Sequence, residues 1–219
     1  MKGLLKNQFY GALGSALVLL AFFVAVGIGL LISGNPSLLN IYVLVASTAF
    51  AFNAVSGFRK EASSKWSKYE LTTPVARKEI VKSRYISHGL WVFAGIILSA
   101  LFVVLTLAIH GNHYFYYDVR DPLMLFCCGA GTALLMGTLF YPAIYLLGTD
   151  KSEIIMIISL LGSIGITIGI IWILNAAYDF RSVSDAEFYL NVAIYMVILL
   201  VSFVLSYFLT TFIYRRKDC

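Results

Sequence analysis

Three histidines are the residues whose type most readily suggests metal binding or acid–base catalysis. His110 and His113 are three apart and could share a metal ion, but Gly111 and Asn112 break the helix that would aim both rings at one point. No third ligand is evident beside them. His88 lies near the edge of a hydrophobic stretch, and nothing around it indicates a catalytic triad. The sequence therefore predicts neither a metal site nor a catalytic residue.

The chain carries no motif for hydrolysing ATP. The phosphate-binding pattern G-x-x-x-x-G-K-[ST] is absent from all 219 residues. The hydrophobic stretches contain no Asp, Glu, Lys or Arg at their centres, although such residues usually mark proton relays and ion-coupled transport. An ion-coupled transporter and an integral-membrane enzyme are both disfavoured, and we expect this chain to bind no cofactor.

One long polar interruption, residues 58–84, offers a surface for binding another protein. It holds eight of the sixteen basic residues, whereas the sequence on either side is apolar. A helix over residues 60–71 would place Ala62, Trp66 and Tyr69 on one apolar face. Trp66 is then either an anchor at the membrane surface or an aromatic anchor in a groove of a partner. We predict a docking surface for a soluble partner.

The two ends of this interruption are predicted to be helical. Glu61 precedes Lys65 by four residues, which is the favoured order for an ion pair within a helix. Thr73 and Pro74 can cap and begin a second helix, which would run through Arg77 into the next hydrophobic stretch. The expected geometry is a short amphipathic helix across the base of a long membrane helix.

Six hydrophobic spans must position this segment. The chain is 60% hydrophobic and 12% charged, far below the roughly 25% charged residues of soluble domains, so we predict an integral membrane protein. The net charge of +5 lies beside the spans, where it sets topology, so we expect no nucleic-acid partner. A short interfacial helix over residues 1–10 precedes the first span. The chain is then one all-α transmembrane domain over residues 1–219, with spans at residues 13–32, 38–57, 86–109, 123–147, 154–174 and 188–213.

Cap and breaker residues mark the ends of several spans. Asn35 is predicted to cap the second span, with Pro36 as its first helical residue. Asp121 and Pro122 repeat this pattern before the fourth span. Pro142, near the far end of that span, is predicted to kink the helix or to end it early.

Lysine and arginine are distributed unequally over the two sides of the membrane. Fourteen fall on the side of both termini and the polar interruption, and only Arg120 and Arg181 on the other. The eleven acidic residues divide almost evenly, so the bias is carried by basic residues, as the positive-inside rule requires. We therefore expect a multi-pass protein of the cytoplasmic membrane with its N- and C-termini in the cytosol.

Small and uncharged polar residues recur at helical spacing within the spans. The fourth span contains Gly129, Ala133 and Gly137. The fifth contains Gly162, Gly165 and Gly169. Such faces let helices pack closely, within one bundle in the simpler interpretation, or along a dimer seam or substrate pathway in the alternative. The polar residues that could line a pathway, and that interhelical hydrogen bonding explains equally well, are Asn40, Asn53, Ser159, Ser163 and Thr167.

The string KWSKYELTTPVARKEIVKSRY, residues 65–85, resembles a signature of the ABC-2 type permeases, in the small six-span bacterial group that includes the membrane subunits of phenol-soluble modulin exporters. The start MKGLLKNQF is also similar to the start of these proteins, and the six-span layout covers the whole chain. Relatives often carry an acidic pair before the lysine–tryptophan, whereas here Glu61 is followed by Ala-Ser-Ser. The matching positions are Trp66, Tyr69, Pro74, Arg77, Lys78, Glu79, Ile80, Val81 and Tyr85.

This resemblance implies a half-transporter in a bacterial cytoplasmic membrane. Two copies of the six-helix unit, or one copy and a sister permease, would be coupled to two separate ABC ATPase subunits that bind ATP and Mg²⁺. The segment between the second and third spans would be a coupling helix that sits in a cleft of the ATPase. The residues expected to make this contact are Glu61, Lys65, Trp66, Tyr69, Glu70, Thr73, Pro74 and Arg77.

The cargo is predicted from the character of the spans. A bundle wall of Leu, Ile, Val and Phe without buried charge suits an amphipathic or lipidic substrate, including short antimicrobial peptides, better than a small ion. The resemblance implies an amphipathic peptide of the phenol-soluble modulin or antimicrobial type, exported from the cytosol. An ABC exporter of lipids or hydrophobic drugs is one alternative. A membrane sensor or immunity protein that binds peptides without transporting them is another, and such a protein would bind no ATPase.

Overall fold

Six long helices form the protein, in a computed structural model that describes residues 2–64, 76–111, 120–176 and 184–216. Each helix is long and apolar enough to cross a membrane. The predicted all-α membrane fold with six long helices is therefore confirmed for the described ranges. In chain order the elements are α1 (Lys2–Ser33), α2 (Pro36–Ser64), α4 (Arg77–His110), α5 (Arg120–Leu147), the short 3₁₀ helix η2 (Thr149–Lys151), α6 (Ser152–Ala176) and α7 (Asp185–Arg216).

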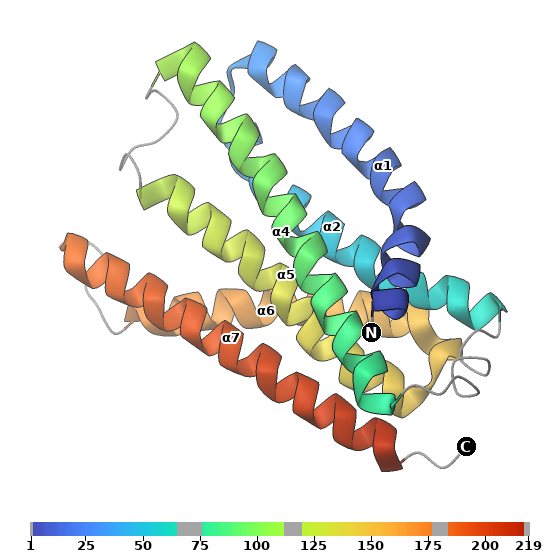
Figure 1. The fold of residues 1–219 in the computed structure, drawn as a ribbon. Coiled ribbons are helices and arrows are strands. Elements are labelled where there is room, and N and C mark those ends of the chain that lie inside the picture. The colour runs from blue at the N-terminus through green and yellow to red at the C-terminus, as the bar shows by residue number, and fades with distance from the viewer. Residues whose placement is uncertain (1, 65–75, 112–119, 177–183, 217–219) are drawn as a thin grey trace.

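The start of α1 and the end of α7 lie at the same end of the bundle (Figure 1). The end of α2, the start of α4 and the junction of α5 with α6 lie there too, at the lower right of the view, and the opposite helix ends spread across the upper left. We call this the basic end, because its described residues include Lys6, Lys78, Lys82, Lys151, Arg215 and Arg216. That the basic end faces the cytosol stays a prediction of the positive-inside rule.

Helices α2, α4 and α5 form the centre of the bundle. Helix α1 packs against α2 and α4, and α6 and α7 pack chiefly against α5. In their most apolar stretches, 50% of the residues of α2 and α5 are buried, against 17% for α1 and α7. The outer helices present exposed Leu, Ile, Val and Phe side chains, which lipid or another membrane protein would cover.

The turn between α1 and α2 follows the predicted cap. The Oδ1 atom of Asn35 accepts hydrogen bonds from the backbone N–H groups of Ser37, at 3.0 Å, and Leu38, at 3.4 Å. Pro36 is the first residue of α2, and Gly34 adopts a φ of 62°, which favours glycine. The prediction that Asn35 caps a helix beginning at Pro36 is confirmed.

Two other helix boundaries differ from the prediction. Helix α4 begins at Arg77 after an extended Ala76 (φ −64°, ψ 135°), so it does not run unbroken from Pro74, which lies outside the described residues with Thr73. Helix α5 already includes Asp121 in its first turn, where a proline at the next position is tolerated because the first N–H groups need no partner. Helix α5 continues past Pro142 to Leu147, the predicted end of the fourth span, so it does not end early at that proline, and a kink there stays a prediction.

The expected break between an interfacial helix and the first span is not seen in the described residues. Lys2–Ser33 form one helix, because the first turns already pack on α4. The Nε2 atom of Gln8 donates a hydrogen bond to Ser83 Oγ at 3.0 Å, and the ring of Phe9 stacks on Trp91 at 5.0 Å. Whether these turns lie at the membrane surface stays a prediction.

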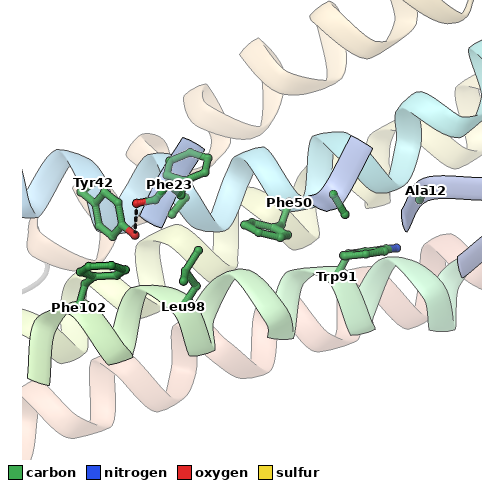
Figure 2. Packing of buried hydrophobic residues seen from close by; sticks show 9 residues of the cluster. Ala12, Phe23, Tyr42, Phe50, Trp91, Leu98 and Phe102 are labelled. Atoms are coloured by element: carbon green, nitrogen blue, oxygen red, sulfur yellow. Dashed lines mark hydrogen bonds between the residues drawn. The ribbon is translucent and has the colours of Figure 1, made fainter. Parts of the chain in front are cut away.

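Rings from three helices form a continuous contact that we call the aromatic seam, comprising Phe23 of α1, Tyr42 and Phe50 of α2, and Trp91 and Phe102 of α4 (Figure 2). Phe50 stacks on Trp91 with centroids 6.2 Å apart, and Tyr42 meets Phe102 edge-on at 5.4 Å. The Tyr42 hydroxyl donates to the backbone oxygen of Phe23 at 3.1 Å. The seam fixes α1 along the groove between α2 and α4.

Polar contacts tie helix ends together on the side opposite the basic end. An ion pair joins Arg120, in the first turn of α5, to Asp185, in the first turn of α7. The Nε2 atom of His110 lies 2.7 Å from the Leu31 carbonyl oxygen and so connects α4 to α1. Ser184 and Glu187 exchange hydrogen bonds as a capping box at the start of α7. The pattern Ser-x-x-Glu at residues 184–187 is the sequence signal for this helix start, whereas the predicted span begins at residue 188.

Candidate functional site

Most of the predicted coupling residues fall outside the part of the chain that the structure describes. Glu61 belongs to α2, but only its backbone is described, and Arg77 is fully placed. The roles predicted for all of these residues therefore stay predictions. The residues outside the described ranges are Lys65, Trp66, Tyr69, Glu70, Thr73 and Pro74.

Arg77 fixes the first turn of α4 to the last turn of α7. Its Nη1 atom donates hydrogen bonds to the backbone oxygens of Tyr214, at 3.0 Å, and Arg215, at 3.4 Å. Its guanidinium also lies 5.6 Å from the centre of the Tyr214 ring. A cation at the C-terminus of a helix is favourable because carbonyl groups there lack helical partners. Arg77 therefore anchors the start of α4, where the chain returns to the bundle after the polar interruption.

Arg84 joins α4 to the end of α2. Its side chain is buried, with 6% exposed, and its guanidinium lies 4.0 Å from the centre of the Phe58 ring. A desolvated cation over an aromatic face is a strong form of this contact. The Phe58 ring in turn meets Phe140, Tyr141 and Tyr145 of α5 at 5.4, 6.0 and 6.2 Å. The helices that lead into and out of the polar interruption therefore meet each other and α5.

Tyr85 connects α4 with α7 and α5 through its hydroxyl group. Its oxygen lies 2.7 Å from Ser206 Oγ and 2.8 Å from Thr210 Oγ1, both on α7. Ser206 Oγ donates its hydrogen to the Thr138 carbonyl oxygen of α5 at 2.7 Å, so it accepts from Tyr85. Tyr85 then accepts from Thr210, and each hydroxyl group in the network has a partner.

His88, near the predicted start of the third span, lies in the interior of the bundle. Its side chain is fully buried, and its Nε2 atom lies 2.9 Å from the Ala133 carbonyl oxygen of α5. The ring stacks on Phe203 of α7, with the ring centres 6.0 Å apart and the planes inclined by 28°. Gly137 makes room for it, because a Cβ atom there would lie 2.6 Å from Nε2. We call Phe58, Arg77, Arg84, Tyr85 and His88, with their partners on α5 and α7, the basic-end joint.

The basic-end joint was missed by sequence reasoning, although a signal existed. Val81, Tyr85, His88 and Val92 lie at positions i, i+4, i+7 and i+11, and all four are buried. This is one face of a helix, and its polar members point to a polar contact inside the bundle. Arg84 was counted only among the basic residues that set topology, because the ring that covers it, Phe58, lies far earlier in the sequence.

The predicted pathway residues lie inside the bundle or at its edge. Asn53 is buried, and its Nδ2 atom donates to the Ala12 carbonyl oxygen of α1 at 3.3 Å. Asn40 is partly buried, and its Oδ1 atom has no hydrogen-bond partner within the described ranges. Ser159, Ser163 and Thr167 form a buried stripe of α6, and Ser163 Oγ donates to Leu160 of its own helix at 2.7 Å. A role in substrate passage stays a prediction for all five.

Small residues of α5 serve packing inside the unit, as the simpler interpretation holds. A Cβ atom at Gly129 would lie 3.1 Å from Ser47 Oγ of α2, and Ala133 is fully buried. On α6, a Cβ atom at Gly162 would meet Leu139 at 3.1 Å, whereas Gly165 and Gly169 have open space beside them. That open face leaves a dimer seam or a pathway possible for α6.

The described residues contain no group of three histidine, cysteine or acidic side chains that could hold a metal ion. His113, the second histidine of the suggested pair, is not among them.

A family comparison covers this whole arrangement. A family model described as ABC-2 family transporter protein matches residues 3–215, which include the six helices and the basic-end joint. No curated protein and no solved structure gives a significant match. Members of this family are membrane components of ABC transporters, with an ABC ATPase as the general partner, and are not catalytic themselves. The chain belongs to the ABC-2 family of transporter proteins.

Proposed function

We propose that this chain is the membrane-spanning half of an ATP-driven exporter, powered by a separate ABC ATPase that docks on the segment between α2 and α4. The observation that carries this proposal is the anchoring of both ends of that segment. Phe58 and Arg84 pack together on α5, and Arg77 is bonded to the end of α7. A displacement of the segment would therefore act on α2, α4, α5 and α7 at once.

Helix α4 is suited to carry such a displacement across the membrane. Its 34 residues correspond to about 51 Å, against about 30 Å for the hydrocarbon core. It therefore extends several turns beyond the bilayer, and its charges, Arg77, Lys78, Lys82 and Arg84, mark the basic end as the one that extends. ATP-driven closure of two ATPases would shift the equilibrium between two arrangements of the helices.

The docking contact would be made by residues 61–77, most of which lie outside the described ranges. Trp66 and Tyr69 are the aromatic anchors, with Glu61, Lys65 and Glu70 beside them. Ala76, directly before α4, is extended, so α4 would not continue unbroken into the proposed docking helix. A second copy of this chain or a sister permease would complete the transporter, and lipid would cover the remaining exposed faces of α1, α6 and α7.

The proposed cargo is an amphipathic peptide. Among described residues, the only buried arginine and histidine are Arg84 and His88, both in the basic-end joint, and no lysine, aspartate or glutamate is buried. The remaining interior is apolar or carries hydroxyl and amide groups, which suits a helical peptide with one apolar face. A lipid or a hydrophobic drug would fit the same wall and is the alternative cargo.

The docking proposal is tested by purifying the permease together with its cognate ATPase. Trp66→Ala and Tyr69→Ala are expected to lose ATPase binding and the stimulation of ATP hydrolysis. Lys68→Ala, in the same segment, is the matched control and is expected to keep both. Full binding and full stimulation in both aromatic variants would show that the coupling assignment is wrong, and no binding by the wild type would favour a non-transporting protein.

The cargo proposal needs a separate measurement. Inverted vesicles that contain both subunits are expected to accumulate a fluorescent amphipathic helical peptide only when ATP is present. A scrambled peptide of the same composition and a fluorescent phospholipid are the controls. Accumulation of the lipid but not the peptide would replace the peptide cargo by the alternative.

A further inference from the structure

The Tyr85 side chain connects α4 to α7 inside the bundle. The Tyr85 hydroxyl bonds two α7 side chains at 2.7 and 2.8 Å, and Ser206 extends the network to a backbone oxygen of α5. The Tyr85 ring is packed between Tyr141 of α5, at 4.6 Å, and Phe203 of α7, at 5.0 Å. Tyr85, Ser206 and Thr210 are buried, so little solvent competes for their hydrogen bonds.

The next buried polar residue on the same face of α4 is His88. Among the residues that the structure describes, only one of its two ring nitrogens has a hydrogen-bond partner. A carbonyl oxygen can only accept, so the His88 Nε2 atom carries a hydrogen and donates it to Ala133 at 2.9 Å. In the neutral ring the other nitrogen, Nδ1, is then an acceptor, and it has no partner within the described ranges. A buried acceptor without a partner destabilises the arrangement that buries it.

These two residues act in opposite directions on the same contact. The Tyr85 network favours a closed contact between α4 and α7, whereas the unpaired His88 nitrogen favours an arrangement in which water reaches it. Two arrangements of similar free energy are what a switching element requires. Arg77, two turns before Tyr85 on α4, places this contact directly after the segment that is proposed to receive the ATPase.

We propose that Tyr85, Ser206 and Thr210 form a latch that holds α4 against α7, and that opening the latch during the transport cycle hydrates His88. Tyr85 is thereby a positioning residue for the transition between the two arrangements. The latch itself follows from the contacts above, and only its link to ATP rests on the proposed function.

The test measures how readily diethyl pyrocarbonate reaches His88 in the purified full-length permease in lipid nanodiscs. The reagent transfers its ethoxycarbonyl group to an unprotonated ring nitrogen and releases ethanol and carbon dioxide, and mass spectrometry reads the modification at each histidine. Tyr85→Phe keeps the ring but removes two hydrogen bonds, so His88 modification is expected to rise about fivefold or more. The matched control is Thr211→Val, because Thr211 Oγ1 bonds only its own helix, at Tyr207, and the rate should not change.

His110 supplies the internal reference, because its Nε2 atom is bonded to Leu31 at the far end of α4. A selective rise at His88 supports the latch. An unchanged rate in Tyr85→Phe, or an equal rise at His110, would overturn it, because the second result is what a general loosening of the fold produces. This measurement uses no ATPase, so failure of the docking proposal leaves it valid.

The link to the cycle is tested in the complex with the ATPase. Wild-type His88 is expected to be modified faster when ATP is bound and hydrolysis is blocked than without nucleotide. An unchanged rate in complexes that hydrolyse ATP would separate the latch from the transport cycle and overturn that link.

Discussion

Helices α1 and α7 are equally exposed, but the contacts that hold them are arranged differently. Both flank the central helices and bury 17% of their most apolar stretch. Helix α1 is fixed by the aromatic seam and by hydrogen bonds spread along its length, at Gln8, Ala12, Phe23 and Leu31. Helix α7 is fixed at the basic end by Arg77, by the Tyr85 network and by stacking on His88.

The difference matters for how each helix could be released. Three of these four hydrogen bonds of α1 end on its backbone carbonyl oxygens, at Ala12, Phe23 and Leu31, and they are spread over its length, so no single side chain can release the helix. The hydroxyl hydrogen bonds that join α7 to α4 and α5 converge on Tyr85 and Ser206, so they can be made or broken as a unit. We infer that α1 is a fixed part of the scaffold, whereas the contact of α4 with α7 is the one that changes. The variants below test this comparison, from the largest expected effect to the smallest.

The tightest point of the aromatic seam is Gly27. A Cβ atom there would lie 2.4 Å from the Phe102 ring, which is itself buried against Tyr42. We expect Gly27→Ala to destabilise the protein by about 1–3 kcal/mol, because overpacking forces α1 away from α4. The measurement is thermal unfolding in detergent, with Gly14→Ala as the control, since a Cβ atom at Gly14 meets nothing within 4 Å. Equal melting temperatures for the two variants would show that α1 is not held rigidly.

The second-largest effect is expected at Arg84, the buried cation of the basic-end joint. Arg84→Lys keeps the charge but loses the planar group that lies on Phe58, so we expect a loss of about 1–2 kcal/mol. ATPase stimulation should fall as well, because the two ends of the docking segment separate. Lys82→Gln is the control, since Lys82 is exposed two residues away on the same helix. If Arg84→Lys kept normal stability and normal ATPase stimulation, Arg84 would have no role in the basic-end joint.

The Asn35 cap and the buried Arg84 show how far the sequence could predict the structure. The span pattern and the Asn35 cap were predictable, because a bilayer requires long apolar helices and a short side chain must satisfy the first N–H groups. The burial of Arg84 was not, because it sits just before a span, where exposed and buried positions carry similar residues. His88 differs, since it shares a buried helix face with Val81 and Tyr85 and its burial carried a signal. In a membrane protein the outward face of a helix is as apolar as the inward face, so periodicity alone does not tell which neighbours it meets.

The same chemical change in the two regions tests the comparison most directly. Tyr42→Phe and Tyr85→Phe each remove one hydroxyl group and keep the ring. Each is expected to cost on the order of 0.6 kcal/mol per hydrogen bond lost, so the melting temperatures should fall only slightly. Transport per ATP hydrolysed is expected to change only in Tyr85→Phe. If Tyr42→Phe altered that ratio by the same factor, α1 would take part in the cycle and the division into scaffold and moving contact would fail.

The smallest expected effect is at the hydroxyl stripe of α6. Ser163 Oγ donates only to Leu160 of its own helix, so Ser163→Ala breaks no contact between helices. A hydroxyl bonded back to its own helix adds little stability, and we expect a change within about 0.5 kcal/mol. Peptide accumulation in vesicles should also match the wild type if the stripe serves packing. A lower transport rate with an unchanged melting temperature would instead place Ser163 on the path of the cargo, and α6 would then join α7 among the helices that work during transport.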